Sequence, residues 1–189
     1  MNQQSAVAES LANPTDRQAA IEHLEALRLD LRGEIKTRIE QRDKYSIQLT
    51  VALAAIVALS ASSGSSTLNL QRVLIAAPLV SIYFTTLILY SYRIHRVIAG
   101  FLRTQVEPNL AQLCGTPPEQ EWETYYQRHT VPGIRQTFFI AALWIICLAT
   151  PVILFFVERE QGEFILPLAI ISIVYLAAAG LITKAFWKG

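Results

Sequence analysis

Uncharged, apolar stretches of nearly equal length recur four times along the chain. They cover residues 46–63, 73–92, 136–157 and 164–183, and none of them contains Asp, Glu, Lys, Arg or His. Each is about 20 residues long, the length that an α-helix needs to cross about 30 Å of hydrocarbon at a rise of about 1.5 Å per residue. The pattern predicts an all-α integral membrane protein with four transmembrane helices.

The polar segment before the first span carries its own helical pattern. Asn13 suits an N-cap and Pro14 suits the first helical position. Apolar residues then recur every three or four positions, which is typical of one face of a helix, at Ala20, Leu24, Leu27, Leu31, Ile35 and Ile39. We therefore expect a disordered tail over 1–13 and an amphipathic helix over 14–45 that continues into the first span.

The segment after the second span also keeps helical spacing. Ile94, Val97 and Phe101 extend the span, and Pro108 is expected to end this extension because proline clashes with the preceding turn. A capping box then begins at Thr116, and it predicts a further short helix that ends near Pro132. Residues 93–134 are thus interpreted as a helical extension followed by a capped helix.

The link between the first two spans is short, so these spans should be antiparallel neighbours whose polar extensions emerge side by side. Each extension has an apolar stripe that the other can cover, at about 25 cal/mol per Å² buried. The prediction is a helical stalk that packs as a coiled coil. Its candidate assembly stripe comprises Leu24, Leu27, Leu31, Ile35, Ile39, Ile94, Val97 and Phe101.

The distribution of Lys and Arg predicts the orientation. Seven precede the first span, five lie between the second and third spans, and two follow the fourth, whereas the two remaining links hold one each. Positive segments stay in the cytoplasm. Both termini, including the tail at 184–189, and the stalk are therefore expected in the cytoplasm, most simply at a bacterial inner membrane.

The composition and the motifs of the sequence argue against several classes of function. The chain is 52% hydrophobic and 16% charged with a net charge of +1, so nucleic acid is not an expected partner. Cys114 and Cys147 fall in different regions and are expected to be reduced thiols. No metal-ligand spacing, nucleophile elbow or phosphate-binding glycine loop is present in the sequence, so we expect no cofactor and no enzymatic activity.

Three groups of residues remain as candidates. The first group is the hydroxyl side chains of the second span at helical spacing, Ser81 and Thr85. The second is one proline in each of three spans: Pro78, Pro151 and Pro167. Both groups either line a pore or serve helix packing. Basic residues at the end of the second span are candidate contacts for lipid headgroups: Arg93, His95 and Arg96.

Two hypotheses for function follow from these features. The first is a non-enzymatic membrane anchor or scaffold that assembles through the stalk, as a homo-oligomer or with a cytoplasmic protein partner. The alternative is an oligomeric ion channel or membrane-disrupting effector that is gated from the cytoplasmic side. The absence of ionisable side chains from the spans disfavours an ion-coupled transporter.

Overall fold

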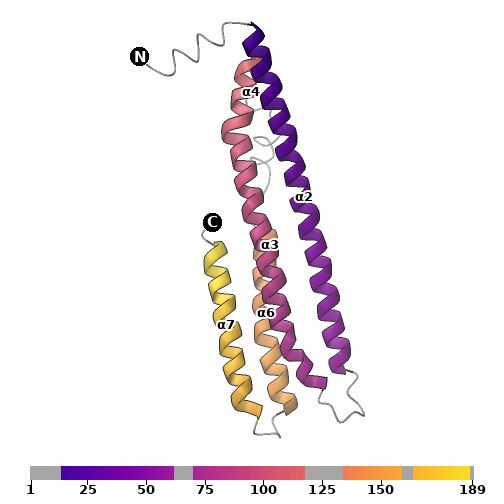
Figure 1. Cartoon of the computed structure of the whole chain (residues 1–189). Helices are drawn as coiled ribbons and strands as arrows, with labels where there is room; N and C mark the ends of the chain where they lie inside the picture. The colour runs from indigo at the N-terminus through magenta and orange to yellow at the C-terminus, as the bar shows by residue number, and fades with distance from the viewer. Residues whose placement is uncertain (1–13, 62–69, 118–133, 159–163, 188–189) are drawn as a thin grey trace. The chain divides into compact units, whose positions relative to one another are not determined.

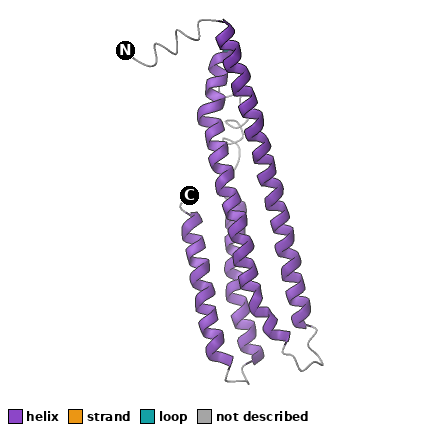
Figure 2. Ribbon diagram, in the orientation of Figure 1, coloured by secondary structure: helices purple, strands orange, loops and turns teal. Residues whose placement is uncertain are grey.

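The computed structural model describes residues 14–61, 70–117, 134–158 and 164–187. These stretches are helical apart from residues 115–117, and none of them forms a strand (Figures 1 and 2). The elements in chain order are α2 (Pro14–Ala61), the 3₁₀-helix η1 (Leu70–Ile75), α3 (Ala76–Phe101), the π-helix η2 (Leu102–Val106), α4 (Glu107–Cys114), α6 (Ile134–Glu158) and α7 (Ile165–Trp187).

Four helical stretches are long and apolar enough to cross a membrane, and they contain the four predicted spans. They are Pro14–Ala61, Arg72–Cys114, Ile134–Val157 and Ile165–Trp187. The predictions of an all-α chain and of a multi-pass membrane protein are therefore confirmed. The predicted tail over 1–13, the end of the first span at 62–63 and the capped helix after Pro117 lie outside the described residues.

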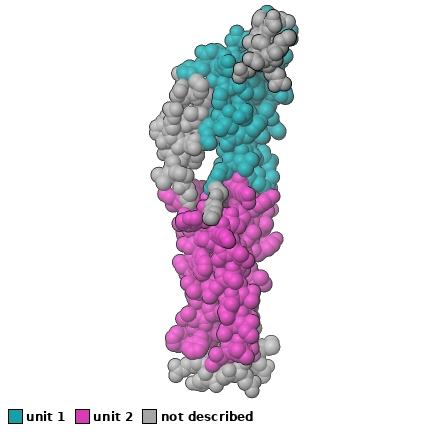
Figure 3. All heavy atoms as spheres, turned by 90° about the vertical axis from the view of Figure 1, so that its left-hand side faces the viewer, with its two compact units in different colours: residues 1–39, 94–132 teal, residues 40–93, 133–189 magenta. Residues whose placement is uncertain are grey.

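The chain forms two compact units, which Figure 3 colours separately. Unit 1 comprises residues 1–39 and 94–132, and unit 2 comprises residues 40–93 and 133–189. Unit 1 therefore contains most of the two polar extensions predicted from the sequence, whereas unit 2 contains the four apolar stretches.

Helices α6 and α7 pack closely in unit 2 around side chains of moderate size. Leu143 and Cys147 of α6 meet Ala179 of α7 in a buried cluster. A residue as small as alanine lets two helices approach closely in the apolar phase. The indole Nε1 of Trp144 also donates a hydrogen bond of 3.0 Å to the Thr183 hydroxyl, so a polar contact joins the same two helices.

The buried face of α3 consists largely of small side chains, some of which carry a hydroxyl group. It begins with Ala77 and Pro78, continues through Ser81 and Thr85, and reaches Ile88 and Leu89. Ser81 is fully buried and Thr85 is 2% exposed. The candidate pore hydroxyls thus lie inside the fold of a single chain, where their small size permits close packing.

The three candidate prolines occupy different structural positions. Pro151 is inside α6, where its missing N–H removes one helical hydrogen bond. Pro78 and Pro167 are each the third residue of their helices, α3 and α7. The N–H groups in the first turn of a helix have no intrahelical acceptor, so Pro167 is tolerated there at little cost, whereas Pro78 follows η1 within the continuous helical stretch Arg72–Cys114.

Substitutions at Ser81 test whether this face is a packing surface. Ser81→Leu is expected to lower the thermal unfolding midpoint in detergent, because overpacking a closed interior typically costs about 1–3 kcal/mol. Ser81→Ala should keep or raise the midpoint, since the buried Ser81 hydroxyl has no hydrogen-bond partner among the described residues. Tyr83→Leu, at a position 60% exposed, serves as the control. An unchanged midpoint for Ser81→Leu would contradict the packing interpretation.

Candidate functional site

The polar extension of α3 is longer than the sequence predicted. The prediction that Pro108 ends it is wrong, because the chain stays helical through η2 and α4 to Cys114. The cause is the π-helix before the proline, in which the N–H of Glu107 donates to the carbonyl of Leu102, five residues earlier. This wider turn accommodates the proline ring, which would clash in a regular α-helix.

Helix α4 ends in a regular cap. Gly115 adopts the left-handed conformation with φ of 73°, and the N–H of Thr116 donates a 2.9 Å hydrogen bond to the carbonyl of Ala111. This geometry is the Schellman motif, which favours glycine because a Cβ is strained at positive φ. Thr116, predicted to cap the next helix, therefore also serves the end of α4.

Two arginines of α2 contact this extension within unit 1. The Arg17 guanidinium donates from Nε to the carbonyl of Leu113 at 3.0 Å, and its Nη2 donates to the same oxygen. Leu113 lies in the last turn of α4, where carbonyls have no intrahelical donor. Arg32 lies further along α2, with its Nη2 3.6 Å from Oε1 of Glu107.

Glu107 is the most deeply buried charged side chain among the described residues of unit 1. Its side chain is 1% exposed, whereas that of Arg32 is 37% exposed. Burying a carboxylate is costly unless a cation compensates for the lost hydration. The ion pair to Arg32 therefore selects the register in which α2 lies beside α4.

The apolar core of this extension lies on a different line from the predicted stripe. The buried apolar side chains are Leu102, Val106, Leu110 and Ala111, each no more than 3% exposed. The first three are spaced by four residues, so they lie on one face of the helix. Leu102 and Val106 keep the helical spacing seen in the sequence, but Leu110 was missed because Pro108 was expected to stop the helix before it.

The candidate assembly stripe divides into two sets of residues. Partly buried side chains come from both extensions and comprise Leu24, Leu27, Leu31, Ile35 and Ile94. Exposed side chains form the second set: Ile39 is 37%, Val97 67% and Phe101 44% exposed. The stripe predicted from the sequence thus contains two kinds of residue, one set partly buried within unit 1 and one set exposed.

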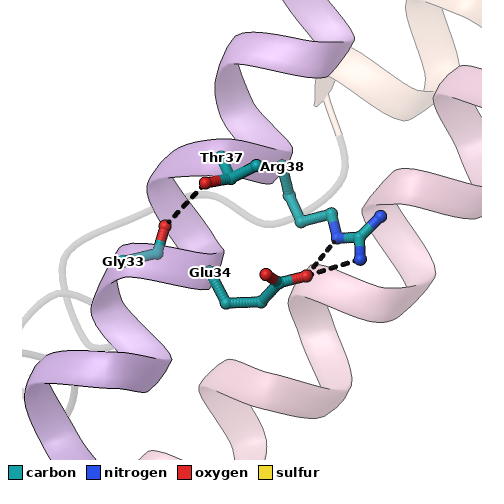
Figure 4. Close-up of polar contacts among 4 residues, drawn as sticks. All are labelled: Gly33, Glu34, Thr37 and Arg38. Carbon is teal, nitrogen blue, oxygen red and sulfur yellow. Dashed lines mark hydrogen bonds and ion pairs between the residues drawn. The ribbon is translucent and has the colours of Figure 1, made fainter.

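Helix α2 is also stabilised by side-chain contacts within the helix. The Nε of Arg38 donates to a carboxylate oxygen of Glu34 at 2.7 Å, and the hydroxyl of Thr37 donates to the carbonyl of Gly33 at 3.1 Å (Figure 4). Pairs of opposite charge four residues apart contribute about 0.2–0.5 kcal/mol each to helix stability.

The basic residues after the second span are only partly accessible. Arg93 and Arg96 are exposed, whereas His95 is half-buried. The described residues contain no group of three His, Cys, Asp or Glu side chains that could hold a metal ion. Cys114 is an exposed thiol in α4 and Cys147 a buried one in α6.

Unit 2 contains a cavity that sequence reasoning did not find. Its volume is about 380 Å³, and it is lined by Arg42, Asp43, Ser46, Tyr92, Ile134, Arg135, Phe138 and Phe139. The guanidinium of Arg42 lies over the ring of Tyr92, 4.1 Å from its centroid. In the sequence, the only indication of this cavity was an arginine or a tyrosine at the polar end of each of three spans.

The ion pair of unit 1 can be tested by hydrogen exchange. Arg32→Gln removes a cation beside the buried Glu107 carboxylate, so amides of α4 should exchange roughly tenfold faster, for a cost of about 1–2 kcal/mol after allowance for the exposure of Arg32. Adding Glu107→Gln should restore part of the protection. Arg38→Gln is the control, and equal effects of Arg32→Gln and Arg38→Gln would contradict a special role for the pair.

Comparison with known proteins adds no family to these observations. Neither the models of protein families, nor the curated proteins, nor the solved structures contain a match to this chain.

Proposed function

We propose that this protein is a non-enzymatic membrane anchor that assembles with further copies of itself through unit 1. The observation that carries the proposal is the exposure of Val97 and Phe101 on α3, at 67% and 44%. The two residues are four positions apart, so they lie on one face of the helix. An apolar pair of this kind on a polar extension gains free energy when a partner covers it.

The polar groups of unit 1 favour an assembly role over a catalytic one. Arg17 is engaged with the end of α4, and Arg32 is paired with the buried Glu107. Arg38 is paired along α2 with Glu34. These contacts use charge to stabilise the unit itself, and the exposed apolar face is what remains for recognition.

Confinement to one membrane favours a second copy of the chain as the partner. Proteins confined to one membrane meet at a high effective concentration, so a small apolar face is sufficient for association. Copies inserted in the same orientation also present the same face. A two-fold axis normal to the membrane can therefore bring the Val97 and Phe101 faces of two copies together.

The distribution of charge supports a cytoplasmic location for unit 1 and for both termini. Fourteen of the sixteen Lys and Arg residues lie in the segments assigned to that side. The positive-inside tendency favours this orientation over its reverse. By the same argument the anchor belongs to a cell membrane in which the tendency operates, such as a bacterial inner membrane.

An ion channel has less support from the same observations. The hydroxyls of the second span are buried, and Thr85 is only 2% exposed. Thr86 is half-buried and donates a 2.7 Å hydrogen bond to the carbonyl of Ile82 in its own helix. Hydroxyls held in this way stabilise packing and are poorly placed to coordinate a passing ion.

Charge on the exposed face should prevent assembly. Val97→Glu with Phe101→Glu is expected to weaken self-association by roughly 100-fold, because burying two large apolar side chains contributes about 3 kcal/mol or more. The measurement is the mass of the protein in detergent by light scattering, over a range of concentrations.

The control is Gln112→Glu, which adds a single negative charge at an exposed position of α4. It should associate like the wild-type protein. A wild-type protein that stays monomeric at every concentration, both in detergent and in membranes, would overturn the proposal of self-assembly. Capture of a different protein that is lost in the double variant would instead assign this face to that partner.

A further inference from the structure

The cavity of unit 2 lies where three spans change from polar to apolar sequence. Arg42 and Asp43 of α2 come just before the first uncharged stretch, which begins at Ser46. Tyr92 of α3 closes the second stretch, and Arg135 of α6 directly precedes the third. Such positions lie at the level of lipid headgroups when helices span a bilayer.

The charges that line the cavity favour an anion. Two guanidinium groups, of Arg42 and Arg135, outweigh the single carboxylate of Asp43. Arg42 is only 9% exposed, so its charge is less screened than that of a surface residue. A guanidinium prefers phosphate and carboxylate oxygens, to which it donates parallel hydrogen bonds.

Stacking on tyrosine orients one of these cations. The guanidinium of Arg42 lies over the Tyr92 ring, 4.1 Å from its centroid, and this cation–π contact favours one orientation of the guanidinium. The ring occupies one face of the guanidinium, and the N–H groups lie in the plane of that group. The geometry fixes the direction in which Arg42 can donate.

The cavity lining also has an apolar part. It is formed by Ile134, Phe138 and Phe139 of α6, and the rings of the two phenylalanines meet edge to face with centroids 5.7 Å apart. Ile134 and Phe138 are each 66% exposed, so this wall opens to the surroundings. A small hydrophilic anion would gain nothing from such a wall, whereas a molecule with an acyl chain would.

We propose that this cavity binds an anionic phospholipid. Arg42 and Arg135 hold its phosphate, and the hydroxyl of Ser46 is available as a further donor. The first carbons of its acyl chains lie against Phe138 and Ile134. A lipid with one negative charge balances the net charge of the lining, while Asp43 disfavours a headgroup of higher negative charge.

The test uses the full-length protein in detergent with short-chain phosphatidylglycerol or phosphatidylcholine. Phosphatidylglycerol should raise the thermal unfolding midpoint in a saturable manner, since a ligand that binds the folded state stabilises it. Phosphatidylcholine should have a much weaker effect. Arg135→Gln should weaken binding of phosphatidylglycerol about tenfold, as expected for loss of one charge-assisted contact.

Three further variants separate binding from folding. Arg42→Gln removes the stacked cation and should also weaken binding, with the midpoint in the absence of lipid reporting any loss of stability. Arg93→Gln removes an exposed arginine that does not line the cavity and should bind as the wild type does. Asp43→Asn should bind phosphatidylglycerol more tightly, because it removes the only carboxylate among the lining residues.

Two results would overturn the proposal. Equal stabilisation by the two lipids, or unchanged binding in Arg135→Gln, would show that the arginines do not recognise a phosphate. Stabilisation by glycerol 3-phosphate at the same concentrations would assign the cavity to a soluble phosphate compound instead of a lipid.

Discussion

A chain in hydrocarbon must satisfy its own backbone hydrogen bonds, and this constraint determines most of the present structure. The described residues of the four uncharged stretches lie in helices, in which backbone N–H and C=O groups pair within the same segment except where a proline such as Pro151 removes an N–H. Three side-chain hydroxyls of the spans pair in the same way: Thr50, Ser172 and Thr183 each donate to the carbonyl four residues earlier. The spans are thus left to associate by the fit of small and apolar side chains, as Leu143 and Ala179 illustrate.

Charge has a different use in unit 1, where water is available to most side chains. The π-helix η2 carries the chain past Pro108, so that Glu107 and Leu110 are both part of a buried surface. Glu107 then requires a cation nearby, and Arg32 of α2 supplies one. A single irregular turn therefore extends the helix and determines which residues of the extension are covered. Val97 and Phe101 remain exposed.

The sequence predicted the spans well because length and the absence of charge are local properties that hydrocarbon demands of every membrane helix. It predicted the second extension poorly. Val97 and Leu102 both continue the helical spacing of apolar residues, and only packing distinguishes the exposed Val97 from the buried Leu102. Glu107 resembles a solvated residue in the sequence, because a glutamate in a helix is usually hydrated. The cavity escaped prediction because Arg42, Tyr92 and Arg135 are far apart in the chain and meet only in the folded unit.

The proposed assembly is tested most directly by cross-linking single cysteines in intact membranes. Cysteine would replace Val97, Phe101 or Gln112 in a Cys114→Ser background, which removes the exposed native thiol. Proximity to a two-fold axis should give disulfide-linked dimers at positions 97 and 101 on mild oxidation, and few or none at position 112 on α4. Dimers that form equally at all three positions, or at none, would contradict assembly through this face.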